Sequence, residues 1–459
     1  MRWSIFLVSV AVIATQVYLF LVSPVAPTSC LFFVWCPNQR PLLAEESFSA
    51  FPGVKEVFEE QLRGGEAYGA QFAVFQNGKK VVSLFGGATS DVDSSPIAEN
   101  TLMALFSSGK AVEPLLVAKL HHLGLLNLSA PISSIWSEFE AQDVTLMELL
   151  RHDAGLAWLE RPLPLLSTHN LTKVRDLLAK TKRSLPKGRR LYHGVLRGVF
   201  LGELIKQATP GFMTRQAYRK FLFSEEQDQN FFLGGDPESA RSRVCPIVAF
   251  SLVKTLGSLL FNVPHMDNVS RNVFSQLFDS SSLVARAVSN AVDMGALAPF
   301  SWTSWSRLNT PDFHDADLSS ASAYGSAAGM ASIMSIAATG GAGHWDDKTQ
   351  SLLLDFSDAE ARKFDHVLGV ETTFTKGGLA AYTAEQRVLD CKAIGAKETC
   401  FIDRLGNLTA FGWEGTGGTL TWIFPELKLS LAYVSNTFHS LEVWLRFHFC
   451  LGMLKFSLS

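Results

Sequence analysis

The most informative stretch of the chain is FSSGKAVEPLLVAKLHHLGLL, residues 106–126. A Ser-x-x-Lys spacing, from Ser107 to Lys110, stands directly before an apolar helical run that ends near Gly124. Three residues along a helix bring two side chains to one face, so the Lys110 amine can reach the Ser107 hydroxyl. A serine hydroxyl needs an adjacent base to act as a nucleophile, and a desolvated lysine can serve. Ser107 and Lys110 are therefore predicted as nucleophile and base.

The same spacing recurs at Ser184 to Lys187 and at Ser251 to Lys254, so the pattern alone does not identify a site. The first repeat contains a proline in a basic, loop-like stretch, and the second lies inside an apolar run. Only Ser107 stands between a strand-rich segment and a helix, and this context favours Ser107.

Strand signals lie at both ends of the chain. Residues 71–87 contain two β-rich runs around Asn77-Gly78, a strong hairpin signal, and residues 411–437 contain three β-rich stretches broken by Gly and Pro. The middle, from Ser107 to about residue 330, is mostly helical in pattern. We predict an α+β fold: an antiparallel sheet built from N- and C-terminal segments and flanked by helices, with an inserted, mainly helical lobe at about residues 110–330.

Two amphipathic helices are expected outside the helical lobe. One is predicted near residues 48–62, ahead of the first strands. The other, at residues 441–456, is too short for a membrane span and carries Arg446, His448 and Lys455, so it is expected to pack on the sheet.

Residues 106–139, followed by VTLMELLRHDAGL at 144–156, resemble the penicillin-recognising serine hydrolases, in particular the class C β-lactamase and esterase branch. The resemblance covers roughly residues 50–455. It implies a β-lactamase/transpeptidase-like fold, with Ser107 as the acylated nucleophile and Lys110 as its activator. Thr145 and Glu148 also form a capping-box pattern, which predicts a short helix that ends before Gly155. His152, near the end of this helix, is expected to position a turn near the site.

The family's second motif is matched by KGRRLYHG, residues 187–194, ahead of another helical run. The resemblance implies that Tyr192 carries protons to and from the serine. Its phenolate is expected to be favoured beside Lys110. His193 is expected to support the tyrosine from behind.

The third motif, GWEGTGG at residues 412–418, departs from the family because Trp413 stands where a Lys or His is usual. The usual cation or imidazole would hold a substrate carboxylate and tune the tyrosine, and a tryptophan is expected to do neither. The glycines, including Gly415, are retained. They leave room for the backbone N–H groups of Thr416 and Ser107 to form an oxyanion hole.

Composition and missing motifs exclude several classes. The balance of 40 Lys+Arg against 43 Asp+Glu argues against a nucleic-acid partner. No Gly-x-Ser-x-Gly, His-Glu-x-x-His or phosphate-loop pattern occurs, and the chemistry needs no metal or cofactor.

Two functions remain open. One is a serine hydrolase that cleaves a small-molecule or peptide ester or amide through an acyl-enzyme on Ser107. The other is a catalytically impaired scaffold or binding protein in which Trp413 blocks the cleft. A homo-oligomer is compatible with either function.

A cluster of basic residues precedes Tyr192. A solvated loop is the ordinary interpretation, and steering of an anionic substrate or partner toward the site is the alternative. Its members are Lys180, Lys182, Arg183, Lys187, Arg189 and Arg190.

The N-terminal segment has the features of a membrane-targeting sequence. Residues 3–22 lack charge and are long enough to cross a bilayer, since a spanning helix needs about 20 residues. We expect a single-pass membrane anchor at residues 1–23, a tether at residues 24–45 and a luminal or extracellular domain at residues 46–459. The domain would be secreted if the segment were a cleaved signal peptide.

Cysteines and glycosylation sequons agree with such a compartment. The six cysteines include two local pairs, Cys30 with Cys36 and Cys391 with Cys400, which would suit short disulfide loops, while Cys245 and Cys450 stand apart. Four Asn-x-Ser/Thr sequons are candidate glycosylation sites: Asn127, Asn170, Asn268 and Asn407.

Overall fold

A computed structural model describes most of the chain between residues 45 and 437. The described residues are 45–49, 54–63, 67–89, 95–163, 171–234, 238–248, 276, 279, 281–289, 308–341, 343–383, 385, 407–415 and 418–437. The segment at 3–22 that we predict as an anchor and the helix predicted at 441–456 lie outside these ranges. Among the helices within them, none is both long and apolar enough to span a bilayer.

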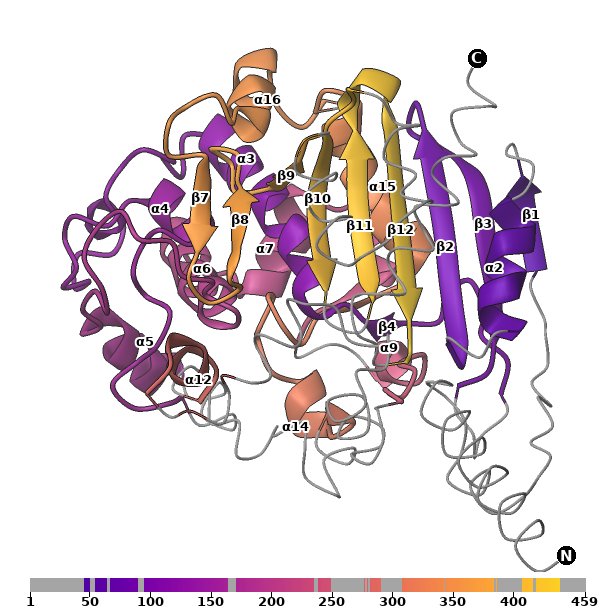
Figure 1. Ribbon diagram of the computed structural model, residues 1–459, viewed down its shortest axis with the longest axis horizontal. Coiled ribbons are helices and arrows are strands. Elements are labelled where there is room, and N and C mark those ends of the chain that lie inside the picture. Colours follow the sequence, from indigo (N-terminus) through magenta and orange to yellow (C-terminus); the bar gives the residue numbers. More distant parts are fainter. Residues whose placement is uncertain are drawn as a thin grey trace, which may run out of the picture.

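A seven-stranded antiparallel sheet forms one half of the molecule (Figure 1). Its strands run in the order β1-β3-β2-β12-β11-β10-β9, so segments from both ends of the chain share one sheet, as predicted. Their bounds are β1 Glu45–Ser49, β2 Gly69–Gln76, β3 Lys79–Gly87, β9 Ala380–Tyr382, β10 Ala410–Gly415, β11 Thr419–Phe424 and β12 Leu429–Ser435. A 3-10 turn, η6 Pro425–Leu427, joins the last two strands.

The hairpin between β2 and β3 follows from its turn residues. Asn77 and Gly78 have φ values of 51° and 76°, which are the positive values that a tight two-residue hairpin turn requires. The predicted hairpin is therefore confirmed.

The sheet is covered on both faces. The helix α2 (Val54–Arg63) buries Phe58 against side chains such as Phe72 and Trp422, while α15 (Ala327–Ala338) packs on the other face against β2, β11 and β12. Alternation of side chains along each strand produces the two faces, since successive residues point in opposite directions.

Most of the remaining helices form a lobe beside the sheet, on the left of Figure 1, while α9 and α14 lie toward the lower centre of that view. The remaining helices are α3 Glu113–His122, α4 Leu146–Leu150, α5 Leu171–Ala179, α6 Leu196–Ala208, α7 Thr214–Phe221, α8 Glu225–Gln229, α9 Glu238–Arg241, α12 Leu283–Ser289, α14 Pro311–His314 and α16 Asp347–Leu354, with 3-10 turns η2 Phe106–Ala111 and η3 Ile132–Ser134. Small sheets accompany them: β4 Met103–Ala104, β5 Phe231–Phe232 and β6 Tyr324–Gly325, and the hairpin of β7 Arg362–Asp365 with β8 Val370–Thr373.

The structure corrects two boundaries near the start of the domain. The first helix begins at Val54 rather than near residue 48, because residues 45–49 pair with β3 as a strand. The tether therefore ends before Glu45. The predicted lobe at about residues 110–330 ends close to α15, which begins at Ala327 and covers the sheet, and α16 joins the lobe from later in the chain by packing on α3.

Candidate active site

Ser107 and Lys110 lie in the 3-10 helix η2, which runs directly into α3. A 3-10 helix has three residues per turn, so side chains three residues apart lie over one another. The Lys110 Nζ is 3.1 Å from the Ser107 Oγ and donates a second hydrogen bond of 2.9 Å to the Ser320 carbonyl. Lys110 is fully buried, whereas Ser107 is partly exposed. The predicted pair is thus in contact, with the serine open to a ligand.

Tyr192 reaches the same serine from the loop before α6. Its hydroxyl is 2.7 Å from the Ser107 Oγ, and the Lys110 Nζ lies 5.1 Å from the centre of its ring. The backbone N–H of Tyr192 donates to the carboxylate of Asp365, at the end of β7, over 3.2 Å. Three side chains from two separate motifs therefore meet at one oxygen atom.

The protonation states of Lys110 and Tyr192 differ from those expected. Burial lowers the pKa of Lys110 to about 7, so much of the amine is neutral near neutral pH. Burial raises the pKa of Tyr192 to about 12, although its hydrogen bond with Ser107 lowers it in part. The prediction that the Tyr192 phenolate is favoured is wrong, because desolvation outweighs the opposing effects of Ser107, Trp413 and the charge of Arg197 on this pKa. Lys110 is the better base, and Tyr192 holds a proton that it can donate.

His152 and His193 support the tyrosine as neutral rings. The Nδ1 of His152 accepts a 2.9 Å hydrogen bond from the backbone N–H of His193, and the Nε2 of His193 accepts one of 2.8 Å from the N–H of Leu156. Burial lowers the pKa of His193 to about 3 and holds that of His152 well below its usual value. The His152 ring centre lies 4.8 Å from that of Tyr192, and its backbone has a positive φ of 63°. Both histidines thus position the Tyr192 segment.

Trp413, in β10, lies against the tyrosine rather than apart from it. Their ring centres are 6.3 Å apart at an interplanar angle of 20°, and the indole also stacks on Phe374 at 5.1 Å. The nearby indole of Trp413 lowers the pKa of the Tyr192 hydroxyl, which opposes part of the effect of burial. The expectation that a tryptophan cannot tune the tyrosine is therefore wrong.

Gly415 brings β10 close to η2. A Cβ atom built on Gly415 would lie 2.6 Å from the Leu105 carbonyl and 2.9 Å from the Ser108 nitrogen, so only glycine permits this approach. Thr416, which we predict as the second oxyanion donor, lies outside the described residues.

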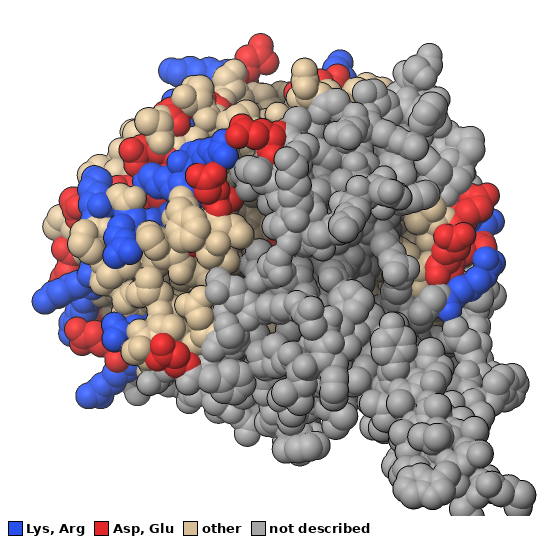
Figure 2. All heavy atoms as spheres, in the orientation of Figure 1, with Lys and Arg blue, Asp and Glu red and all other residues tan. Residues whose placement is uncertain are grey.

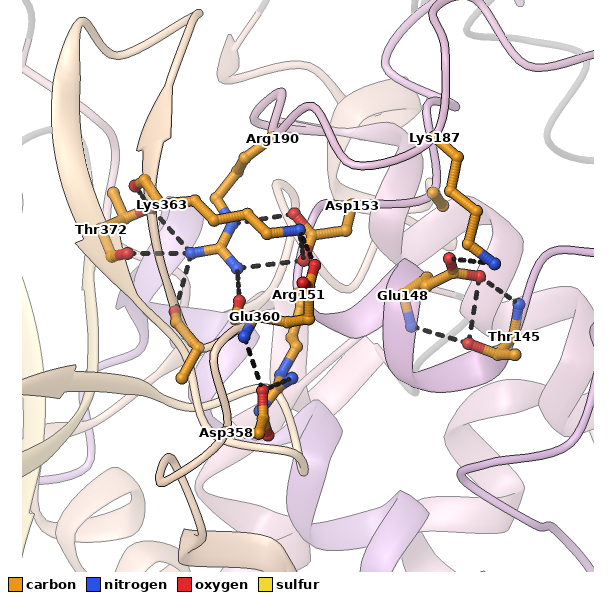
Figure 3. A network of polar contacts seen from close by, with 12 residues as sticks. Thr145, Glu148, Arg151, Asp153, Lys187, Arg190, Asp358, Glu360, Lys363 and Thr372 are labelled. Carbon is orange, nitrogen blue, oxygen red and sulfur yellow. Dashed lines mark hydrogen bonds and ion pairs between the residues drawn. The ribbon is translucent and has the colours of Figure 1, made fainter.

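Two buried ion pairs support the site, and sequence reasoning missed both. Glu113 and Arg197 are fully buried, with Oε2 and Nε 2.8 Å apart. Arg190 makes two 3.0 Å contacts to the carboxylate of Asp153 (Figure 3). Glu113 and Arg197 each stand alone among apolar residues of a helix, and an isolated charge in such a position was a usable signal of a buried pair.

The basic cluster before Tyr192 does not form a free cationic surface. Arg190 is fully buried, Arg183 lies 3.1 Å from Asp143, and Lys187 lies 3.2 Å from Glu148. Lys and Arg alternate with Asp and Glu over the described part of the face seen in Figure 2. Arg183, Lys187 and Arg190 are therefore paired within the fold. These three residues are not free to steer an anionic substrate or partner toward the site.

Several other predictions can be placed. Ser184 and Lys187 do not pair with each other, because Ser184 donates to the Trp158 carbonyl and Lys187 binds Glu148, while residues 251–254 lie outside the described ranges. Among the described residues, no cluster of His, Cys, Asp and Glu could hold a metal ion.

The remaining covalent-modification predictions fall largely outside the structure. Asn127 and Asn407 are exposed, as glycosylation requires, whereas Asn170 and Asn268 are not described. Cys245 is buried. The other five cysteines lie outside the described ranges, so both predicted disulfides stay predictions.

Comparisons with known proteins agree with this fold. The family model described as Beta-lactamase matches residues 54–244. The esterase/beta-lactamase LipL of Mycobacterium tuberculosis is 26% identical over 202 residues, which are 43% of this chain and 46% of LipL. The aligned part is thus less than half the length of that relative.

Solved structures extend the likeness to nearly the whole chain. A penicillin-binding protein homologue from Caulobacter crescentus has a TM-score of 0.67 at 22% identity, covering 90% of this chain and 100% of its own. EstA from Arthrobacter nitroguajacolicus Rue61a has a TM-score of 0.66 at 24% identity, covering 90% and 99%. The fold is therefore of the β-lactamase/transpeptidase-like class. The predicted resemblance to the β-lactamases is thus confirmed by the family model over residues 54–244 and by the fold over most of the chain.

Proposed function

We propose that this protein is a serine hydrolase that cleaves an ester or amide through an acyl-enzyme on Ser107. One observation carries the proposal: the Ser107 Oγ lies 3.1 Å from the Lys110 amine and 2.7 Å from the Tyr192 hydroxyl. The printed names of the similar proteins include an esterase/beta-lactamase and a family VIII carboxylesterase, which favours esters as the first substrates to test. A catalytically impaired scaffold would not need Ser107, Lys110 and Tyr192 to be in contact, so this arrangement favours the hydrolase.

In the first half-reaction, neutral Lys110 takes the hydroxyl proton of Ser107 as the Oγ attacks the carbonyl carbon. The negative charge that forms on the carbonyl oxygen is held by backbone N–H groups, for which Ser107 and Thr416 are the proposed donors. When the intermediate collapses, Tyr192 gives its proton to the leaving oxygen or nitrogen, and the Lys110 ammonium reprotonates Tyr192.

In the second half-reaction, water attacks the acyl group on Ser107. Lys110, neutral again, takes a proton from this water, and the Ser107 Oγ regains a proton as the acid product leaves. The cycle uses only groups of this chain and water.

The rate of acylation is expected to depend on pH through Lys110. Because the amine must be neutral to act as base and its pKa lies at about 7, the rate should fall about tenfold per pH unit below this value. It should level off above pH 8, since Tyr192, with a pKa of about 12, keeps its proton there. The rate of labelling by a fluorophosphonate, measured from pH 5 to 9, checks this. A flat profile across this range would exclude Lys110 as the base.

The acyl-enzyme itself can be tested by rapid mixing with a p-nitrophenyl ester of a short fatty acid. We expect a burst of p-nitrophenol close to one per chain, followed by slower turnover, if deacylation limits the rate. A folded protein that neither bursts nor turns over any of a panel of esters and amides would favour the scaffold alternative.

We propose further that residues 3–22 anchor the protein in a membrane, with the domain in a glycosylating compartment. The support is the length of the uncharged segment and the exposure of Asn127 and Asn407. The full chain expressed in eukaryotic cells should stay in the membrane pellet after alkaline carbonate extraction, and glycosidase treatment should lower its apparent mass. Asn127→Gln should remove one glycan. Release into the carbonate supernatant would contradict the anchor.

A further inference from the structure

Arg197, in α6, is a buried cation that contacts several of the segments around the site. Its Nη2 donates to the Lys110 carbonyl over 3.1 Å, and its Nη1 donates to the carbonyls of Leu150 and Gly378 over 3.2 Å each. Its Nε lies 2.8 Å from the Glu113 carboxylate. The guanidinium thus joins the nucleophile segment, the end of α4 and the turn before β9.

The same guanidinium lies beside the residue that departs from the family pattern. The Arg197 Cζ is 4.7 Å from the ring centre of Trp413, within the range of a cation–π contact. Trp413 in turn stacks beside Tyr192, with ring centres 6.3 Å apart. The positive charge near the third motif therefore lies behind the indole, on α6, instead of on the strand.

We propose that Arg197 is a positioning residue that supplies, from behind Trp413, the positive charge that the family's third motif normally carries on its strand as Lys or His. This inference rests on the proposed hydrolase function. It assigns Arg197 a role that the sequence motifs do not give it.

Electrostatics supports the assignment. The charge of Arg197 lowers the pKa of Lys110 and that of Tyr192, while Glu113 raises the pKa of Lys110. The charges act strongly on one another because Lys110, Glu113 and Arg197 are all buried, where the effective dielectric constant is lower than in water.

Few titratable groups face Lys110 and Arg197. Lys110 faces Glu113 from α3, Arg197 from α6, Tyr192 from the loop before α6 and neutral His152 from the end of α4. Arg197 additionally faces His193, which is neutral, and the Tyr218 phenol of α7. The two members of the Glu113–Arg197 pair therefore act on Lys110 in opposite directions.

Because Glu113 and Arg197 act on Lys110 in opposite directions, their neutral variants should shift the pH profile in opposite directions. An ion pair with only a structural role would not produce such opposite shifts. In the full-length protein, the rate of Ser107 labelling by a fluorophosphonate is measured against pH for the wild type and for Glu113→Gln, Arg197→Gln and Arg197→Lys. We expect the acid limb to move to lower pH by about 1 unit in Glu113→Gln, and to higher pH by about 1 unit in Arg197→Gln. Arg197→Lys keeps the positive charge, so the acid limb of its pH profile should stay in place. Its labelling rate should fall, because a lysine cannot make all the hydrogen bonds that the guanidinium donates to backbone carbonyls.

Folding is checked by near-ultraviolet circular dichroism, since a buried pair is being broken. If Arg197→Gln does not fold, Glu113→Gln and Arg197→Lys decide the question. The result that overturns the proposal is a lowered rate with an unmoved acid limb in Glu113→Gln, or a shift in the same direction in both neutral variants. Absence of any labelling of Ser107 in the wild type would instead refute the proposed function, so the two failures are distinguishable.

Discussion

Ser107→Ala is expected to lower ester hydrolysis by at least about 10³-fold, because the variant has no atom that can form the acyl-enzyme. Lys110 and Tyr192 would remain in place, but without the Ser107 hydroxyl there is no nucleophile for Lys110 to deprotonate. Steady-state hydrolysis of the best p-nitrophenyl ester, with the wild type and the variant at equal concentration, measures the loss.

Ser108→Ala is the matched control for this change. Ser108 is the next residue of the same 3-10 helix, but it is buried and its Oγ donates to the Leu105 carbonyl over 2.7 Å, away from the reacting groups. Its replacement should cost some stability and only a small factor in rate. Equal losses in the two variants would show that the effect of Ser107→Ala comes from a disturbed helix and not from a missing nucleophile.

Asp153→Ala is expected to destabilise the fold by about 3–5 kcal/mol, because it leaves the buried guanidinium of Arg190 without its counter-ion. Arg190 is fully buried and Asp153 is only 5% exposed. Lys363 would also lose a carboxylate at 3.3 Å (Figure 3). The free energy of unfolding from equilibrium urea denaturation checks the prediction.

Lys187→Ala provides the comparison, because Lys187 lies on the same loop as Arg190. Its ion pair with Glu148 joins a side chain that is 62% exposed to one that is 18% exposed, so its loss should cost less than about 1 kcal/mol. Similar values for the two variants would contradict the view that burial, and not the mere presence of an ion pair, gives the Arg190 network its importance. Arg190 stands two residues before Tyr192, so labelling of Ser107 should slow in Asp153→Ala as well.

Much of the architecture could be predicted because its signals are local. Asn77-Gly78 requires a hairpin whatever surrounds it, and Thr145 with Glu148 forms the predicted capping box at the start of α4. The contact of Ser107 with Lys110 is local too, since the two residues are three positions apart. Tyr192 lies 85 residues from Ser107, and only the family resemblance indicated that the two meet.

The protonation states could not be predicted from the sequence because they depend on burial. A lysine beside Tyr192 in the site suggests a stabilised phenolate, but the fold buries both Lys110 and Tyr192, and burial raises the pKa of the phenol. In the same way, Trp413 looks like the loss of a cation until the fold places Arg197 behind it. Glu113 and Arg197 belong to different helices, and no pattern along the chain pairs them.

The most direct test of the account is to map the site of covalent labelling by mass spectrometry. The wild type and Ser107→Ala are treated with a fluorophosphonate, digested and sequenced by tandem mass spectrometry. The account predicts one adduct per chain, on Ser107, which is absent from the variant. A folded wild type that carries no adduct, or an adduct on another serine that persists in Ser107→Ala, would contradict it.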